Sequence, residues 1–188
     1  MEAAQHPSMT PSLDRLAAEH DALRVAMVIL ARQTAHVQAG LPFPREDCAH
    51  LLRFLQAFVV GVHFHKESDL LLPRLAMQGD PTAAALAGVL LRLQEEFESL
   101  LQALVVFWEP RGELTPSERQ GFASAASALQ SLSRRMLASE ERGLFPRIAR
   151  LPGDDRLEWA RACGDLERER SVLAQWQPSL DELSHRWN

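Results

Sequence analysis

The sequence predicts an all-α protein, an up-down-up-down four-helix bundle with an additional C-terminal helix. Three observations predict this fold class. Apolar residues recur at three- and four-residue steps along four long stretches, which is the spacing of the buried face of a helix. A proline stands near the start of each stretch. No stretch alternates apolar and polar residues as a half-buried strand does, and long helices joined by short loops form such a bundle.

The four prolines indicate where the helices begin, because the first helical position needs no N–H. They occur in Thr10-Pro11, Phe43-Pro44, Asp80-Pro81 and Thr115-Pro116. In the last case Thr115 can cap the helix while Glu118 bonds back to the cap amide, which is a capping box. The expected helices span about residues 11–37, 45–77, 81–109 and 117–150, and a fifth runs from Asp154 to about Trp176.

The composition bounds the domain count and the partners. A chain of 188 residues is expected to form a single domain, 1–188, because domains of ~100–200 residues are common. Within it we expect the bundle over 10–150 and a helical extension over 151–188. The net charge is −5 without a lysine- or arginine-rich block, which disfavours nucleic acid and anionic membranes as partners. No apolar run approaches the ~20 residues of a membrane span, so a cytoplasmic protein is expected.

The two cysteines, Cys48 and Cys163, stand alone in the sequence. Neither belongs to a CxxC pattern or to a disulfide framework, so we expect both to stay reduced and to behave as small apolar residues.

Three of the four apolar stripes contain histidine or glutamate. His20 stands in the first stripe, His63 and Glu67 stand one turn apart in the second, and Glu140 stands in the fourth. The third stripe is expected to be purely apolar and consists of Leu86, Leu90, Leu93, Phe97, Leu101 and Leu104. Four polar groups from three helices are therefore expected in one core.

Two interpretations of these four residues remain open. In the first they form a satisfied buried network, in which His20 bonds Glu67 and His63 bonds Glu140. In the second they bind a metal ion, since a buried charge is costly unless it is paired or bound to a metal, and bundle cores hold metals through inward carboxylates and histidines. Neighbouring polar residues are expected elsewhere: His65 and Asp69 on another face of the helix, and Glu95, Glu96 and Glu98 at the surface.

Two similar runs of sequence carry a family resemblance. They are "HFHKESDLLLP" at residues 63–73 and "MLASEERGLFP" at residues 136–146, and "EHDAL" precedes them on the first helix. Both runs resemble the HxxxEExxLFP motif of the hemerythrin-like, or HHE cation-binding, domains, and the resemblance covers about residues 10–150. Ser68 and Leu72 depart from the motif in the first run. Met136 stands where the second run would have its histidine.

The resemblance implies a bundle with a di-iron site in its core. It assigns as metal ligands His20, His63, Glu67 and Glu140. It also places Phe97 and Met136 where the family has histidines on the third and fourth helices. Because those two histidines serve the same iron in the family, one iron would keep its histidines and the other would lose them. The resemblance therefore implies one non-haem metal ion, with iron favoured and manganese or zinc chemically acceptable.

Two classes of function follow. In the first, the metal binds or reacts with a small molecule such as O2, NO or peroxide, and an enzyme of this kind would be a non-haem metal-dependent oxidoreductase. In the second, the protein is a metal-free bundle that binds a small organic ligand or serves as a structural module. Raised pKa values or mutual hydrogen bonds would then neutralise the buried acids, and Phe97 and Met136 would line an apolar pocket or simply pack. Fold alone cannot choose between these classes.

Overall fold

The computed structural model describes residues 11–77, 79–108, 113–170 and 172–188, and every regular element in these residues is helical. The first helix is α1 (Pro11–Gln38). The second runs from α2 (Arg45–Phe54) through η1 (Leu55–Phe64) and η2 (Lys66–Leu71) to α3 (Leu72–Met77). The third is α4 (Pro81–Val105), followed by the short turn η3 (Val106–Trp108). The fourth runs from α5 (Pro116–Ser139) through η4 (Glu140–Leu144) to α6 (Phe145–Ala149). The all-α prediction is confirmed, although Thr10 and Glu109, at the expected edges of two helices, lie outside the described residues.

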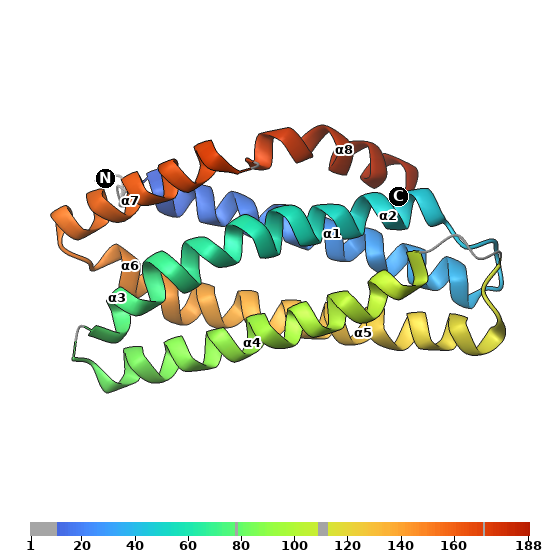
Figure 1. Ribbon diagram of the computed structural model, residues 1–188, viewed down its shortest axis with the longest axis horizontal. Helices are drawn as coiled ribbons and strands as arrows, with labels where there is room; N and C mark the ends of the chain where they lie inside the picture. Colours follow the sequence, from blue (N-terminus) through green and yellow to red (C-terminus); the bar gives the residue numbers. More distant parts are fainter. Residues whose placement is uncertain (1–10, 78, 109–112, 171) are drawn as a thin grey trace, which may run out of the picture.

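The four helices run alternately up and down, as Figure 1 shows. α5 packs against α1 and α4, and α1 also packs against α2. Two further helices, α7 (Gly153–Glu169) and α8 (Leu173–Arg186), lie on the side of the bundle away from α4 and α5. α7 packs against η2, and α8 packs against α1 and α2.

The prediction of a single helix from Asp154 to about Trp176 in the C-terminal extension is wrong. The backbone is extended at Arg170 and Val172, so the extension consists of two helices. This break lets α8 direct its own apolar residues, Leu180 and Leu183 among them, onto the core of the bundle. The division of the chain at about residue 150 stays a prediction.

Local interactions and glycine residues mark several of the helix ends. The expected capping box is present at the start of α5: Thr115 N donates to Glu118 Oε2 over 2.7 Å, and Glu118 N donates to Thr115 Oγ1 over 3.3 Å. Gly40 and Gly79, which follow α1 and α3, have φ values of 77° and 75°. Glycine adopts these left-handed values without a steric cost and so ends a helix readily.

The two helices with the repeated run are both π-helical at corresponding glutamates, Glu67 in η2 and Glu140 in η4. The Leu72 N–H donates to the carbonyl of Glu67, and the Phe145 N–H donates to the carbonyl of Glu140. A proline directly follows Leu72 and Phe145. Because proline lacks an N–H and its ring crowds the carbonyl four residues back, it favours a wider preceding turn. Such π-helical turns are frequent at functional sites.

Two apolar clusters fill the bundle. The larger includes Phe58, Phe97 and Phe122, and the smaller includes Leu16 and Trp159. Along α1, His20 lies between members of the two clusters, and Glu67 and Glu140 take the same place on their own helices. The polar centre therefore lies between two apolar regions.

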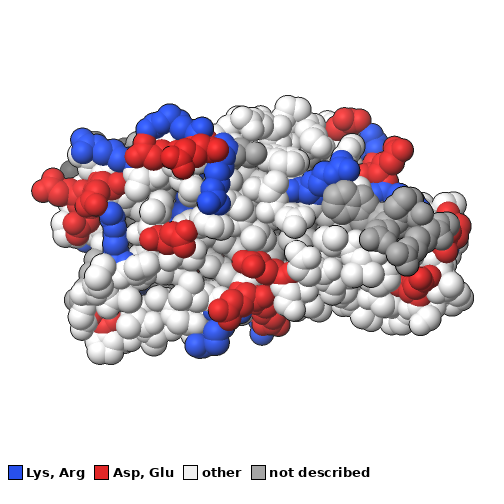
Figure 2. All heavy atoms as spheres, in the orientation of Figure 1, with Lys and Arg blue, Asp and Glu red and all other residues white. Residues whose placement is uncertain are grey.

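The surface carries charges of both signs. Figure 2 shows acidic and basic side chains intermingled on the face in view. Among the described helices, none combines the length and the apolar character that crossing a membrane requires.

Candidate metal centre

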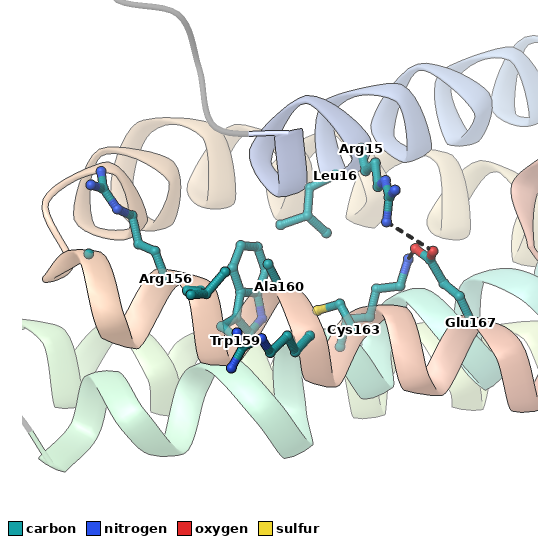
Figure 3. Close-up of a pocket in the computed structure, with 11 residues that line it drawn as sticks. Arg15, Leu16, Arg156, Trp159, Ala160, Cys163 and Glu167 are labelled. Atoms are coloured by element: carbon teal, nitrogen blue, oxygen red, sulfur yellow. Dashed lines mark hydrogen bonds and ion pairs between the residues drawn. The ribbon is translucent and has the colours of Figure 1, made fainter.

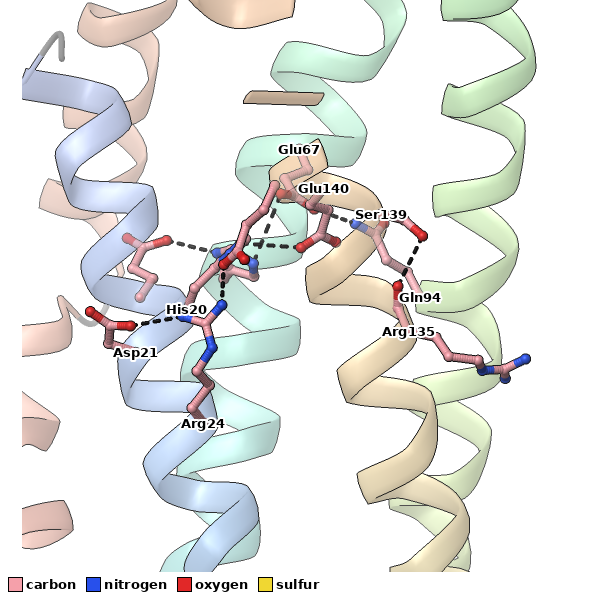
Figure 4. A network of polar contacts seen from close by, with 11 residues as sticks. His20, Asp21, Arg24, Glu67, Gln94, Arg135, Ser139 and Glu140 are labelled. Atoms are coloured by element: carbon pink, nitrogen blue, oxygen red, sulfur yellow. Dashed lines mark hydrogen bonds and ion pairs between the residues drawn. The ribbon is translucent and has the colours of Figure 1, made fainter. Parts of the chain in front are cut away.

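Four buried side chains from three helices meet in the core. His20 comes from α1, His63 and Glu67 come from η1 and η2, and Glu140 comes from η4. One potential ligand atom of each lies within 4.8 Å of those of the others. In Figure 4, His20, Glu67 and Glu140 converge from their separate helices. The structure thus brings together all four residues that the sequence singles out.

The contacts within this group differ from the expected network. Nε2 of His20 lies 3.1 Å from Oε2 of Glu140, and Nε2 of His63 lies 3.9 Å from Oε1 of Glu67. The expected pairs, His20 with Glu67 and His63 with Glu140, are therefore wrong. His63 and Glu67 are neighbours because they occupy successive turns of one helix.

Five polar atoms of the centre lack a hydrogen-bond partner. They are Nε2 of His20, Nε2 of His63, Oε1 of Glu67 and both carboxylate oxygens of Glu140, and all are buried. Buried polar atoms in native proteins nearly always have a partner. The unsatisfied atoms belong to the four residues that converge, so a single bound cation could satisfy them together.

A chain of charged residues supports His63 from behind. We call His63, Glu19, Lys66 and Glu167 the buried arm. Nδ1 of His63 lies 2.8 Å from Oε2 of Glu19, and Lys66 Nζ donates to Oε1 of Glu19 and, over 2.6 Å, to Oε1 of Glu167 on α7. The side chains of Glu19 and Lys66 are only 4% and 3% exposed. Burial alone would raise the pKa of Glu19, but its hydrogen bond to His63 and the charges of His63 and Lys66 hold it below the usual value.

A similar chain supports His20 on the other side. We call His20, Glu141, Arg24 and Asp21 the open arm. Nδ1 of His20 lies 3.0 Å from Oε1 of Glu141, which also accepts from Arg24 Nη2, and Arg24 Nη1 donates to Asp21 over 2.8 Å. Arg24 is 45% exposed and Glu141 is 35% exposed. Figure 4 shows Asp21 and Arg24 on α1 beside His20.

The two arms fix how both imidazoles are presented. An ionised carboxylate only accepts hydrogen bonds, so each histidine donates from Nδ1 to the glutamate of its arm. The lone pair of Nε2 is then directed into the centre. This is the arrangement in which a carboxylate orients a metal-binding histidine and increases its basicity.

The third helix contributes one polar residue, so the expectation of a purely apolar stripe is wrong. Gln94 is buried, and its Nε2 donates to Oε2 of Glu67 over 2.8 Å. Leu86 and Leu93, expected in the stripe, are only partly buried. Gln94 stands directly before Glu95 and Glu96, which are expected at the surface, and it is not among the residues expected in the core. Its place three residues before Phe97 on the same helix was the signal that could have found it.

Two ionised carboxylates without a cation are electrostatically unfavourable in this buried centre. Burial raises the pKa of Glu67 well above its usual value, and the neighbouring Glu140 carboxylate raises it further. Burial would lower the pKa of His20, but the Glu140 carboxylate, whose Oε2 lies 3.1 Å from Nε2, raises it. The centre thus favours added positive charge, which a proton or a metal cation can supply.

The remaining candidates lie outside the group of four. Phe97 and Met136 are fully buried, and the Phe97 ring packs edge-on against Phe64 with ring centroids 5.1 Å apart. Nδ1 of His65 lies 3.0 Å from the carbonyl oxygen of Val60. Asp69, expected on another face of the helix, is exposed, and so are Glu95, Glu96 and Glu98, which were expected at the surface.

Both cysteines are buried and free, and burial raises the pKa of each thiol to about 12. A thiol with so high a pKa is protonated at neutral pH and is a poor nucleophile. Neither cysteine belongs to the group of four.

Comparison with known proteins places the chain in a family. The family model of the hemerythrin HHE cation binding domain matches residues 11–148. Comparisons with curated proteins and with solved structures gave no match. The matched segment contains the four converging residues and ends before α7 and α8. Since this segment covers most of the sequence, the chain belongs to the hemerythrin HHE cation-binding domain family.

Proposed function

We propose that the chain binds one non-haem metal ion, with iron favoured, through His20, His63, Glu67 and Glu140. The five unpartnered polar atoms of these residues carry the proposal. Two imidazole nitrogens with carboxylate oxygens form a donor set that suits iron(II), manganese or zinc. A divalent cation would also balance the two carboxylate charges, whose mutual repulsion is costly in a buried site. The residues present therefore fit a metal ion.

One ion rather than two is proposed because of Phe97 and Met136. These two side chains take the positions at which the family resemblance implies further histidines, and both are fully buried. A phenyl ring supplies no donor atom, and methionine in a core usually serves as packing. Nitrogen donors remain on the side of His20 and His63 only.

The proposed ligands of the metal are small molecules such as O2, NO or peroxide, and an activity as a non-haem oxidoreductase is part of the same proposal. When bound, iron would supply open coordination positions and redox chemistry. A cavity of about 430 Å³ between α1 and α5 is lined by Arg24 and Glu141 of the open arm. We therefore expect small molecules to approach from the open arm. A cytoplasmic location stays an expectation from the sequence.

The alternative, a metal-free helical module, has one observation in its favour. Phe97 lies in the larger apolar cluster together with Met136. This arrangement supports simple packing more than an organic-ligand pocket at this place. A packed module alone, however, leaves the five polar atoms without partners.

The metal content of the protein, purified without added metal or reloaded with iron(II), tests the proposal. Elemental analysis should give no more than one tightly bound transition metal ion per chain. His63→Ala should abolish binding. His65→Ala is the matched control and should retain the metal. His65 lies on another face of the helix, and among the described residues its ring bonds a backbone carbonyl.

Two outcomes would contradict the proposal. Two irons per chain would show that Phe97 and Met136 do not mark a lost half-site. Equal metal content in the His63→Ala and His65→Ala variants would remove the assigned ligand set. In the reverse direction, Phe97→His together with Met136→His should raise bound iron toward two per chain.

A further inference from the structure

A second cavity lies outside the metal centre, between α1, η2 and α7. Its volume is about 460 Å³, within the range of small-molecule sites. The lining is largely apolar and includes Leu16, Leu157, Trp159, Ala160 and Cys163. Figure 3 shows Trp159 in the middle of the cavity, with the Arg15–Glu167 pair at one end and Arg156 toward the other. α7 supplies most of these residues and lies outside the segment that matches the family.

The charge at the cavity is predominantly positive. Arg15, Lys66, Arg156 and Arg161 line it, and Glu167 is the one acidic residue among its lining residues. Arg15 and Lys66 share Glu167, and Arg156 donates to the carbonyl of Ala149. Arg161 has no ion-pair partner among the described residues. An anion at this place would therefore meet more positive charge than the protein itself neutralises.

An unsatisfied donor adds an independent observation. Trp159 is 1% exposed, and its indole Nε1–H has no hydrogen-bond partner among the described residues. A buried indole usually finds an acceptor. A ligand with an acceptor oxygen and a flat apolar body would satisfy this N–H and cover the apolar lining.

We propose that this cavity binds a small organic carboxylate, with its apolar body against Trp159 and its carboxylate toward the arginines. Binding itself does not depend on the metal centre. Apolar burial would supply most of the affinity, and the basic residues would select the charged compound over a neutral one of the same shape.

The cavity also connects to the metal centre through the buried arm. Lys66 lines the cavity and donates to Glu19, which in turn pairs with Nδ1 of His63. A carboxylate that draws Lys66 toward the cavity would leave more negative charge on Glu19. That negative charge lies beside His63 and attracts a cation in the centre, so the metal would bind more tightly. This coupling, unlike the binding of the carboxylate, rests on the proposed metal function.

Calorimetric titration with 2-naphthoate, and with neutral 2-naphthylmethanol as the matched compound, tests the cavity. We expect one naphthoate per chain, bound at least about tenfold more tightly than the alcohol. Ala160→Phe should fill the cavity and weaken binding at least tenfold. Arg161→Gln should weaken naphthoate about threefold to fivefold, because an exposed ion pair contributes little. Arg92→Gln, an exposed arginine of α4 away from the cavity, should leave the affinity unchanged.

Several results would overturn the proposal. They are the absence of naphthoate binding at millimolar concentration, equal affinity for the alcohol, and equal affinity of the Arg161→Gln and Arg92→Gln variants. Thermal melts of each variant confirm folding, and Arg161→Gln, a surface change, keeps the test valid if Ala160→Phe does not fold.

The coupling is tested with Co²⁺, whose visible absorption reports metal binding. Saturating naphthoate should tighten Co²⁺ binding at least about threefold, and Co²⁺ should tighten naphthoate binding by the same factor, because coupling between two sites is reciprocal. Naphthoate binding without any effect on Co²⁺ would overturn the link through Lys66. Absence of Co²⁺ binding would instead overturn the metal function, while the cavity proposal would stand.

Discussion

The two arms behind the histidines have the same chemical order but different surroundings. In each, an imidazole meets a glutamate, the glutamate meets a cation, and the cation meets a second carboxylate. In the buried arm the cation is Lys66, 3% exposed, whereas in the open arm it is Arg24, 45% exposed. α7 accounts for part of this difference, because it packs against η2 and supplies Glu167.

One chemical motif therefore serves two purposes within a single site. Both glutamates orient a histidine, and this task needs only a short hydrogen bond. In the buried arm, however, each charge depends on its protein partner, because water cannot replace that partner. In the open arm water can reach Glu141, Arg24 and Asp21, so this outer part can rearrange when a small molecule arrives. Substitutions at matched positions should therefore have unequal effects.

The largest difference is expected between the two cations. In metal-free protein, Lys66→Met leaves Glu19 buried without its cation and should lower the free energy of unfolding by about 3–5 kcal/mol. Arg24→Met exposes Glu141 to more water and should lower it by only about 0–1 kcal/mol. Urea denaturation of the two variants measures both values. Similar losses would mean that solvent reaches Lys66 and that the two arms are equivalent.

A smaller difference is expected for the two glutamates that hold the histidines. Loss of such a partner costs about 10–100-fold in metal affinity. Glu19→Gln should weaken metal binding by nearly 100-fold, because no water replaces the charge beside His63. Glu141→Gln should weaken it by only about tenfold. Competition with a chelator of known affinity measures both, and a larger loss for Glu141→Gln would reverse the assignment of the arms.

The fold and the four converging residues were accessible from the sequence because both depend on short-range patterns. Prolines and the Thr115–Glu118 capping box mark helix starts whatever the tertiary structure is. His20, His63, Glu67 and Glu140 share spacing with apolar residues, which places them on buried faces. These signals act within one or two turns of one helix, so a single sequence contains them in full.

The arms and the C-terminal break were not accessible, because they depend on which helices become neighbours. Lys66 is one residue from Glu67 and looks like an ordinary surface lysine until α7 covers it. Its partner Glu167 lies in a run of charged residues, a pattern that indicates a solvent-exposed helix face. The break at Arg170 likewise follows from the packing of α8 on the bundle, and no proline or glycine in the sequence marks it. The spacing of Gln94 from Phe97 indicates that Gln94 is buried. Its hydrogen bond to Glu67, however, depends on the packing of α4 against η2.

The smallest difference is expected at the outer end of each arm. Glu167→Gln keeps an acceptor for Lys66 but removes a charge, and Glu19 still pairs with that lysine, so the loss in unfolding free energy should be about 1 kcal/mol. Asp21 is 76% exposed, and Asp21→Asn should cost less than about 0.5 kcal/mol.

The effects of these two substitutions should also differ in their dependence on salt. At 1 M salt the screening length falls to about 3 Å, which should abolish the effect of Asp21→Asn but preserve most of that of Glu167→Gln, since partly buried pairs are screened less. Urea midpoints at low and high salt provide the measurement. If salt abolished both effects equally, α7 would not shield Lys66 from solvent, and the distinction between a buried and an open arm would be lost.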